Sequence, residues 1–151
     1  MEIRDIIEPD AVIPHLKANS KKQALQELAR LASDITGLAQ REVFDVVLQR
    51  ERLGSTGVGN GIAIPHGKLP GLERLYGLFA RADHAIDFDA VDDQPVDLVF
   101  LLLAPERAGA DHLKALAKVS RLLRDQSVCA RLRGCSTSAA IFTLLTEPDA
   151  A

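Results

Sequence analysis

The sequence contains few of the residues on which nucleic-acid-binding proteins depend. Its 151 residues include no tryptophan, one tyrosine and five phenylalanines, so it has few aromatic side chains on which unpaired bases could stack. Its 18 lysines and arginines are balanced by 21 aspartates and glutamates, and neither sign forms a long run. A nucleic-acid surface would show clustered basic residues instead. We therefore expect no nucleic-acid partner.

The sequence also lacks a long hydrophobic run. The longest, LVFLLLA at residues 98–104, is too short to span a bilayer and is typical of a strand buried on both faces. The N-terminal stretch MEIRDIIEPD has early acidic residues and no apolar segment of the kind that a signal peptide has. We expect a cytoplasmic protein that does not insert directly into a membrane.

Cysteine and metal-ligand patterns are equally sparse. The two cysteines, Cys129 and Cys135, have no CxxC spacing and no histidine nearby. Their even number permits a disulfide, but a cytoplasmic protein favours reduced thiols. The four histidines form no HxxxH pair, so no sequence pattern supports a metal site. A site assembled from distant segments would not produce such a pattern and stays open. The histidines are His15, His66, His84 and His112. His15 and His84 belong to no motif, so we interpret both as structural or exposed.

The apolar periodicity predicts one domain in which helices and strands interleave. The length and the 47% hydrophobic content suit a single core. Ser20 and Gln23 form a capping-box pattern, and Gly37 provides a stop, which predicts a helix between them. Other expected elements are helices over 40–54 and 111–124, strands over 62–64, 75–82, 85–88 and 95–105, and one or two short C-terminal helices. The predicted fold class is α/β, a single domain with a mixed β-sheet flanked by helices on both faces.

One loop concentrates glycine. In GSTGVGNGIAIPHGK, residues 54–68, four glycines precede a short apolar strand and a Pro-His pair. Glycine loses the most conformational freedom on folding, so such a loop usually lets the backbone approach another group closely. It is not a P-loop, because no Gly-Lys-Ser/Thr follows, and it does not match the GxGxxG dinucleotide motif, because no helix follows. Nucleotide binding is rejected on these grounds.

His66 is the candidate for covalent chemistry. A neutral imidazole nitrogen is nucleophilic near pH 7 and can carry a phosphoryl group, a transfer that needs mainly positioning and charge neutralisation. Arg50 offers a guanidinium that pairs with phosphate oxygens. Ser55 and Thr56 add hydroxyl donors, and glycine-rich backbone can present N–H groups to an anion. Pro65 restricts the backbone ahead of the histidine.

These residues resemble the active-site signature of enzyme IIA proteins of the fructose/mannitol type, in the bacterial phosphoenolpyruvate:sugar phosphotransferase system. The likeness is greatest to the nitrogen-related branch, which typically has GSTGIGNGIAIPHGKL followed by DNQPVDL. This chain has GSTGVGNGIAIPHGKL and then DDQPVDL at residues 92–98. The likeness is specific mainly between residues 50 and 112. It implies one enzyme IIA type-2 phosphotransfer domain spanning residues 1–151.

The resemblance also assigns roles to individual residues. It implies that His66 is phosphorylated on Nε2 while a backbone carbonyl holds Nδ1. Arg50 matches the arginine beside the phosphohistidine, and His112 matches a second histidine that helps bind the phosphoryl group without carrying it. Ser55 and Thr56 fall in the loop that lines the phosphoryl pocket. Members of the family use no metal and no bound cofactor, so none is expected here.

The implied function is that of a phosphocarrier that accepts its phosphoryl group from an HPr-like phosphohistidine donor. Such a donor should dock on an apolar rim around His66. In the nitrogen-related branch the phosphorylation state is read by regulatory protein targets, such as potassium-transport systems or sensor kinases. The alternative is a sugar-transport enzyme IIA that passes phosphate to a sugar-specific IIB domain. A third reading, a degenerate member that keeps the fold without phosphorylation, is disfavoured because His66, Arg50 and His112 are all present.

Overall fold

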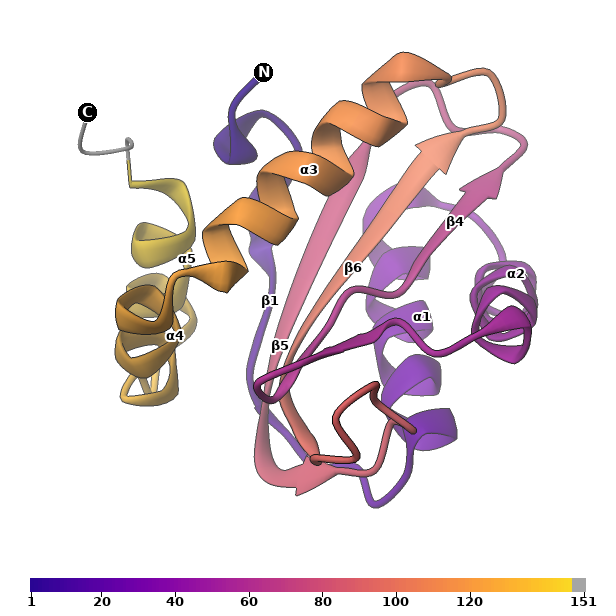
Figure 1. Ribbon diagram of the computed structural model, residues 1–151. Helices are drawn as coiled ribbons and strands as arrows, with labels where there is room; N and C mark the ends of the chain where they lie inside the picture. Colours follow the sequence, from indigo (N-terminus) through magenta and orange to yellow (C-terminus); the bar gives the residue numbers. More distant parts are fainter. Residues whose placement is uncertain (148–151) are drawn as a thin grey trace.

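The structure is a computed structural model that describes residues 1–147 of the chain (Figure 1). A six-stranded sheet forms its centre. The strands are β1 (Ile7–Leu16), β2 (Gly57–Gly59), β3 (Ile62–Ala63), β4 (His66–Leu69), β5 (Tyr76–Ile86) and β6 (Val96–Pro105). The helices are η1 (Ile3–Asp5), α1 (Lys21–Thr36), α2 (Gln40–Leu53), α3 (Ala110–Arg124), α4 (Gln126–Arg133) and α5 (Ser138–Thr146).

Strand β6 lies at the centre of the core. All of its residues from 98 to 104 are buried, as the long apolar run predicts for a strand covered on both faces. It pairs antiparallel with β5 and parallel with β3 and β4, and β5 pairs parallel with β1. The strand order β1-β5-β6-β3-β2 places β1 at one edge. The sheet is therefore mixed, as predicted.

Strands β3 and β4 follow one another along the same edge of β6. Ile62 of β3 lies opposite Leu98, and His66 of β4 lies opposite Leu102. Ile64 and Pro65 lie between the two paired stretches and interrupt the regular ladder. Here the Ile64 amide donates to the Thr56 carbonyl and the Pro65 carbonyl accepts from the Leu102 amide, whereas the Ile64 carbonyl accepts from a side chain, Nδ1 of His66.

Helices cover the sheet on both faces, as predicted. Figure 1 shows α3 crossing in front of the sheet and α1 behind it. Helix α1 packs on β1 and β5, α2 packs on α1 and β4, α3 packs on β6, and α5 packs on β1. None of the helices in the described part of the chain has both the length and the apolar character needed to cross a membrane.

The two N-terminal helices begin and end where the sequence signals lie. Ser20 caps α1 by accepting a hydrogen bond from the Gln23 amide, and Gly37 ends it in the left-handed conformation at φ 80°, which glycine adopts without a Cβ penalty. Helix α2 ends at Gly54 in extended conformation. Two helices, α4 and α5, follow α3, in agreement with the expected short C-terminal helices. Cys129 is buried, Cys135 is partly exposed, and both are free thiols.

Two expectations about the strands differ from the structure. The predicted strands at 75–82 and 85–88 are a single strand, β5, with a register irregularity between Arg81 and Ile86. The polar residues Asp83 and His84 lie at its exposed end instead of forming a turn. Strand β1 was not predicted; its two prolines, Pro9 and Pro14, are tolerated because β1 is an edge strand.

Candidate functional site

Three segments converge on the His66 ring. His66 is the first residue of β4, directly after residues 64–65, which separate β3 from β4. Arg50 comes from the last turn of α2, and His112 from the first turn of α3. The three residues proposed from the sequence as a reactive set therefore lie together in the structure.

Hydrogen bonds to both ring nitrogens define the protonation state of His66. Nδ1 lies 3.0 Å from the Ile64 carbonyl oxygen, which only accepts, so Nδ1 carries the proton. Nε2 lies 3.2 Å from Nε of Arg50, which only donates, so Nε2 accepts through its lone pair. The ring is a neutral imidazole with the lone pair on the nitrogen that faces the arginine.

Arg50 is held in place by a second contact. Its Nη1 donates to the Gly54 carbonyl at 2.9 Å, so the guanidinium spans from the end of its own helix to the histidine. The approach of α2 to β4 depends on Gly67. A Cβ at that position would lie 2.7 Å from Cγ1 of Val46, closer than side-chain atoms pack. Glycine after His66 therefore lets the arginine-bearing helix pack directly against the histidine-bearing strand.

His112 is the buried second histidine of the site. Its side chain is 7% exposed and its ring centroid lies 5.7 Å from that of His66. Its Nδ1 is buried and has no hydrogen-bond partner within residues 1–147. Burial is the main cause that lowers the pKa of His112 below its ordinary value, and the neighbouring His66 ring and Lys68 ammonium act in the same direction. His112 is therefore neutral at pH 7 and retains unused hydrogen-bonding capacity.

Lys68 is a further cation of the site that the motif analysis did not single out. It follows His66 by two residues on β4, and alternate residues of a strand project from the same face. Its charge acts on His112. Together with Arg50 it makes the surroundings of the two histidines positive. If β4 had been predicted, the alternation of side chains along a strand would have placed Lys68 on the same face as His66.

The hydroxyls of Ser55 and Thr56 are engaged within the loop. Ser55 Oγ donates to the Phe88 carbonyl and accepts from the Gly57 amide at 3.0 Å. Thr56 is buried, and its hydroxyl and amide both donate to the Glu51 carboxylate. Both side chains fix the conformation of the loop that precedes the histidine. A direct contact of either hydroxyl with a phosphoryl group stays a prediction.

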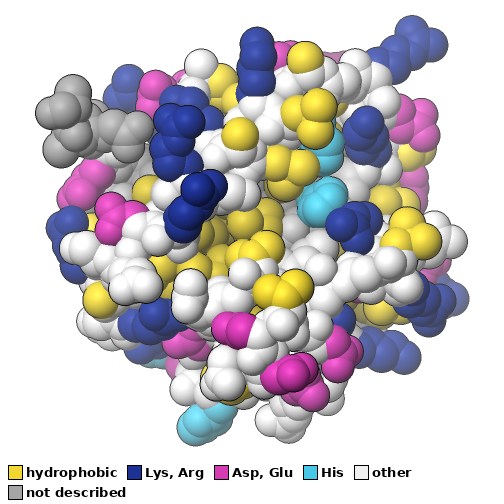
Figure 2. Space-filling view, viewed as in Figure 1, with side chains coloured by type: hydrophobic (Ala, Val, Ile, Leu, Met, Phe, Trp, Pro, Cys, Tyr) yellow, Lys and Arg dark blue, Asp and Glu magenta, His cyan; other side chains and the backbone are white. Residues whose placement is uncertain are grey.

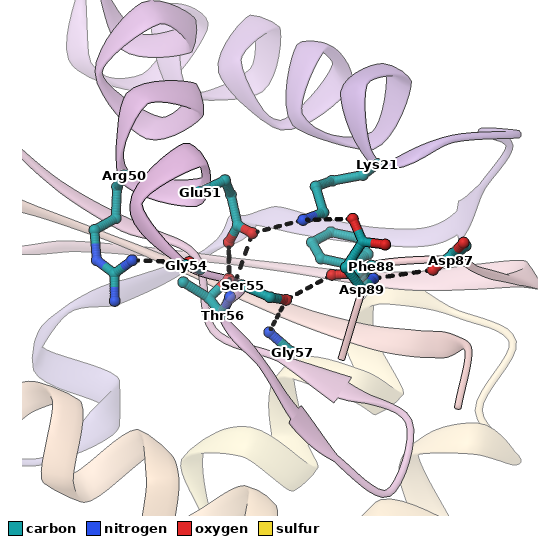
Figure 3. A network of polar contacts seen from close by, with 10 residues as sticks. All are labelled: Lys21, Arg50, Glu51, Gly54, Ser55, Thr56, Gly57, Asp87, Phe88 and Asp89. Atoms are coloured by element: carbon teal, nitrogen blue, oxygen red, sulfur yellow. Dashed lines mark hydrogen bonds and ion pairs between the residues drawn. The ribbon is translucent and has the colours of Figure 1, made fainter. Parts of the chain in front are cut away.

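Glu51 is a buried acid that the sequence analysis did not identify. It is 6% exposed and lies four residues after Val47, which lies four after Val43, so it continues the buried stripe of α2. Lys21 Nζ donates to its Oε2 at 3.0 Å. Figure 3 shows the carboxylate between Lys21 and the loop residues. The spacing of this carboxylate, four residues after one buried valine and eight after another, is the sequence signal that would have indicated its burial.

Residues 5–147 match the family model "Phosphoenolpyruvate-dependent sugar phosphotransferase system, EIIA 2". The chain belongs to this EIIA 2 family. It is similar to a "Nitrogen regulatory protein" of Bradyrhizobium diazoefficiens, with 61% identity over 99% of this chain and 98% of the relative. A protein of the same name from Escherichia coli K12 is 37% identical over 99% of this chain and 92% of the relative.

A solved structure is also similar. The crystal structure of "Nitrogen Regulatory Protein IIA-Ntr" from Neisseria meningitidis superimposes with a TM-score of 0.90 at 35% identity, covering 95% of this chain and 99% of the other. The family resemblance seen in the loop of residues 54–68 is thus confirmed over nearly the whole chain, and the mixed α/β fold agrees with it.

Hydrophobic side chains are exposed on the segments that frame the site of this EIIA 2 protein. Figure 2 shows histidines on one face with Lys or Arg and hydrophobic side chains beside them. Leu53 ends α2, Val58 lies on β2, and Leu113 follows His112; they are 86%, 55% and 67% exposed. Val91, in the loop next to β2, is 78% exposed. The site thus opens onto a surface that is partly apolar and partly basic.

The other two histidines lie elsewhere. His15 contacts Asp83 and the Ser136 carbonyl, and His84 is exposed near the end of β5. Within residues 1–147 no three His, Cys, Asp or Glu side chains come together in a way that could hold a metal ion.

Proposed function

We propose that the chain is a phosphocarrier in which Nε2 of His66 accepts a phosphoryl group from the phosphohistidine of a small HPr-like protein. Membership of the EIIA 2 family supports phosphotransfer. The observation that carries the assignment to His66 is the pair of ring contacts, one to an acceptor and one to a donor, which leave the Nε2 lone pair facing the site cations. That lone pair is the nucleophile that the reaction needs.

The transfer balances without a metal or an additional base. The Nε2 lone pair attacks phosphorus, an N–P bond forms to His66, and the N–P bond to the donor histidine breaks with its electron pair returning to the donor nitrogen. The proton on Nδ1 stays in place, held by the Ile64 carbonyl. The phosphorylated ring then carries a positive charge that partly balances the phosphoryl oxygens, and the same steps run in reverse.

Arg50, His112 and Lys68 supply the electrostatic part of the mechanism. The Arg50 side chain, hydrogen-bonded to Nε2 in the unmodified protein, moves onto the phosphoryl oxygens, to which a guanidinium donates strongly. His112 is close enough to donate to another oxygen, which would use its unpartnered Nδ1. Lys68 adds positive potential. Groups positioned in this way stabilise the charge that is spread over the transferring phosphoryl oxygens.

The donor is proposed to dock on the exposed hydrophobic side chains around the site. Leu53, Val58, Val91 and Leu113 lie on segments next to the site residues. An apolar centre with charged groups beside it is the usual composition of a transient protein interface. Because phosphoryl transfer requires the two histidines to meet, the docking surface has to surround His66.

The proposed role of the phosphorylation is regulatory. The relatives from Bradyrhizobium diazoefficiens and Escherichia coli bear the name nitrogen regulatory protein, and we propose the same role here, with regulatory protein targets that include a potassium transporter or a sensor kinase. The alternative is sugar transport, in which His66 passes its phosphoryl group to a sugar-specific IIB domain. The family description, which refers to a sugar phosphotransferase system, supports this alternative.

The first experiment is intact-protein mass spectrometry after incubation with phosphoenolpyruvate and the general phosphotransferase components, with His66→Ala in parallel. One acid-labile phosphoryl group on the wild type and none on the variant is the expected result. A wild-type protein that stays unmodified while the same donor phosphorylates another acceptor would contradict the proposal.

A second experiment separates regulation from sugar transport. The phosphorylated protein is mixed with purified sugar-specific IIB domains, and loss of its phosphoryl group is followed over time. The regulatory role predicts that the phosphorylated form persists, whereas rapid loss to one IIB domain would establish the transport role instead.

A further inference from the structure

We propose that Glu51 is a positioning residue that fixes both ring nitrogens of His66. The proposal rests on the proposed phosphoryl transfer at His66. It arises from an unusual feature of α2, a carboxylate that is 6% exposed although the helix around it is charged and solvated. A buried carboxylate requires hydrogen bonds and a counter-charge to offset the loss of water. The groups that bind Glu51 are connected by further hydrogen bonds to the groups that contact Nδ1 and Nε2 of His66.

The first route leads from Glu51 to Nδ1. The carboxylate accepts from the Thr56 amide, 3.2 and 3.3 Å from its two oxygens, and from the Thr56 hydroxyl. The carbonyl of Thr56 accepts from the Ile64 amide at 3.0 Å, and the carbonyl of Ile64 accepts from Nδ1 of His66. A shift of Thr56 would therefore be transmitted to the carbonyl that determines the tautomer.

The second route leads from Glu51 to Nε2. The backbone turns at Gly54, whose amide donates to the Glu51 carbonyl at 3.2 Å. Two residues later the Glu51 side chain holds Thr56, so the intervening turn is tied at both ends. The Gly54 carbonyl is thereby directed at Nη1 of Arg50, and Nε of the same guanidinium reaches Nε2 of His66.

Lys21 supplies the counter-charge. Its Nζ donates to Glu51 at 3.0 Å, lies 3.7 Å from Asp89, and lies 5.4 Å from the centroid of the Phe88 ring. The carbonyl of Phe88 in turn accepts from Ser55. The first residue of α1 and residues 88–89 of the loop after β5 thus join the same network, as Figure 3 shows.

Core packing alone would not require a carboxylate at this position. Residue 51 continues the stripe formed by Val43 and Val47, where an apolar side chain would bury equally well. A buried ion pair is often replaced by apolar residues without loss of stability. A double variant that removes both charges leaves no charge buried alone, but Glu51→Met also leaves the buried Thr56 amide and hydroxyl without an acceptor, which lowers stability. A control variant that lowers stability without touching this network therefore separates stability from positioning.

The experiment compares two double variants. Glu51→Met with Lys21→Met removes both charges and every acceptor for Thr56. Glu51→Gln with Lys21→Met removes the same charges and keeps an amide oxygen that can accept from Thr56. Leu28→Ala, at a fully buried position of α1, serves as the control for destabilisation alone; it is expected to lower Tm and leave the transfer rate unchanged.

Two readouts are used on each folded protein. The first is the ¹⁵N spectrum of the His66 imidazole, which reports the tautomer without any phosphorylation. The second is the initial rate of phosphorylation with phosphoenolpyruvate and the general components. In the Met/Met variant we expect mixed tautomers and a rate about 10- to 100-fold lower, since misplacement by about 1 Å has effects of this size. In the Gln/Met variant we expect one tautomer and a rate within about 3-fold of wild type.

A Met/Met variant with the wild-type tautomer and the wild-type rate would overturn the proposal. Equal losses in the Met/Met and Gln/Met variants would also overturn it, because the charge and not the contact with Thr56 would then matter. Failure of the phosphocarrier function itself is distinguishable. In that case even the wild type is not phosphorylated, while the ¹⁵N spectra still report whether Glu51 fixes the His66 ring.

Discussion

His66 and His15 show how neighbouring groups give one residue type two different properties. Each ring is hydrogen-bonded through both nitrogens. His15 Nδ1 lies 2.9 Å from an Asp83 carboxylate oxygen, and its Nε2 lies 2.9 Å from the Ser136 carbonyl. Both partners of His15 are acceptors, whereas His66 has one acceptor and one donor.

The consequence is a difference in available lone pairs. Both partners of His15 only accept hydrogen bonds, so neither of its nitrogens is hydrogen-bonded through a lone pair in the way that Nε2 of His66 is. His66 keeps its Nε2 lone pair because the Arg50 guanidinium cannot accept a proton. The difference therefore depends on partners outside the rings, and replacing these partners should affect the two regions to very different degrees.

The largest effect is expected from removing the donor at His66. In Arg50→Gln the phosphoryl oxygens lose a charged hydrogen-bond partner, which is worth about 1.5–3 kcal/mol. The initial rate of phosphorylation should fall by about 10- to 150-fold, while circular dichroism stays that of the wild type. Arg50→Lys should recover only part of the rate, because an ammonium cannot replace the planar fork. A rate for Arg50→Gln near that of the wild type would show that the guanidinium is dispensable.

A smaller effect, with a defined pH dependence, is expected at His112. Its lowered pKa means that the unfolded chain takes up a proton below about pH 6.5 while the folded protein does not. Stability is therefore fully present above that pH and decreases as pH falls. A phosphoryl group on His66 places negative charge beside His112 and raises the pKa of His112, so phosphorylation should become more favourable towards lower pH.

The His112→Asn variant tests this dependence. We expect a transfer rate about 10-fold lower and a phosphorylated fraction that depends less on pH than that of the wild type, measured between pH 6 and 8 with the same donor. Equal pH dependence in the two proteins would assign the titration to another group.

The smallest effect is expected at the contrasting histidine. The hydrogen bond from His15, which opposes the effect of burial, lowers the pKa of Asp83. The contribution of this contact to stability is thus present above the unfolded carboxyl value of about 3.9 and is lost as pH falls below it. Asp83→Asn and His15→Phe should lower Tm by no more than about 2–4 °C and leave phosphorylation of His66 unchanged. A lower phosphorylation rate in either variant would contradict the separation of the two regions.

The same two regions differ in how far the sequence predicted them. The glycine-rich loop, Pro65 and His66 are contiguous, so local patterns indicated the reactive set, and His112 entered through the family signature. The His15 contacts could not be predicted, because Asp83 and Ser136 lie far along the chain and meet His15 only through β1, which was not predicted.

The missed elements have a common physical reason. Strand β1 contains Pro9 and Pro14, which are acceptable only because it lies at an edge. Strand β4 is four residues long, and it is defined by pairing with β6 instead of by any periodicity of its own. Glu51 stands between two arginines in the sequence, and only the approach of Lys21 and Thr56 distinguishes it as a buried, hydrogen-bonded carboxylate. The pairing of β1 and β4 and the burial of Glu51 all depend on tertiary contacts, which local sequence patterns do not reveal.

The interruption between β3 and β4 at residues 64–65 has a consequence for how such a site would be mapped by mutagenesis. The group that keeps the proton on Nδ1 of His66 is the main-chain oxygen of Ile64, which every substituted residue at that position would retain. A scan of side-chain replacements would therefore pass over one of the groups that determine the tautomer of His66. Chemical synthesis that replaces the Ile64 carbonyl oxygen with sulfur would reach it, because a thioamide sulfur is a poorer hydrogen-bond acceptor and the proline ring is kept.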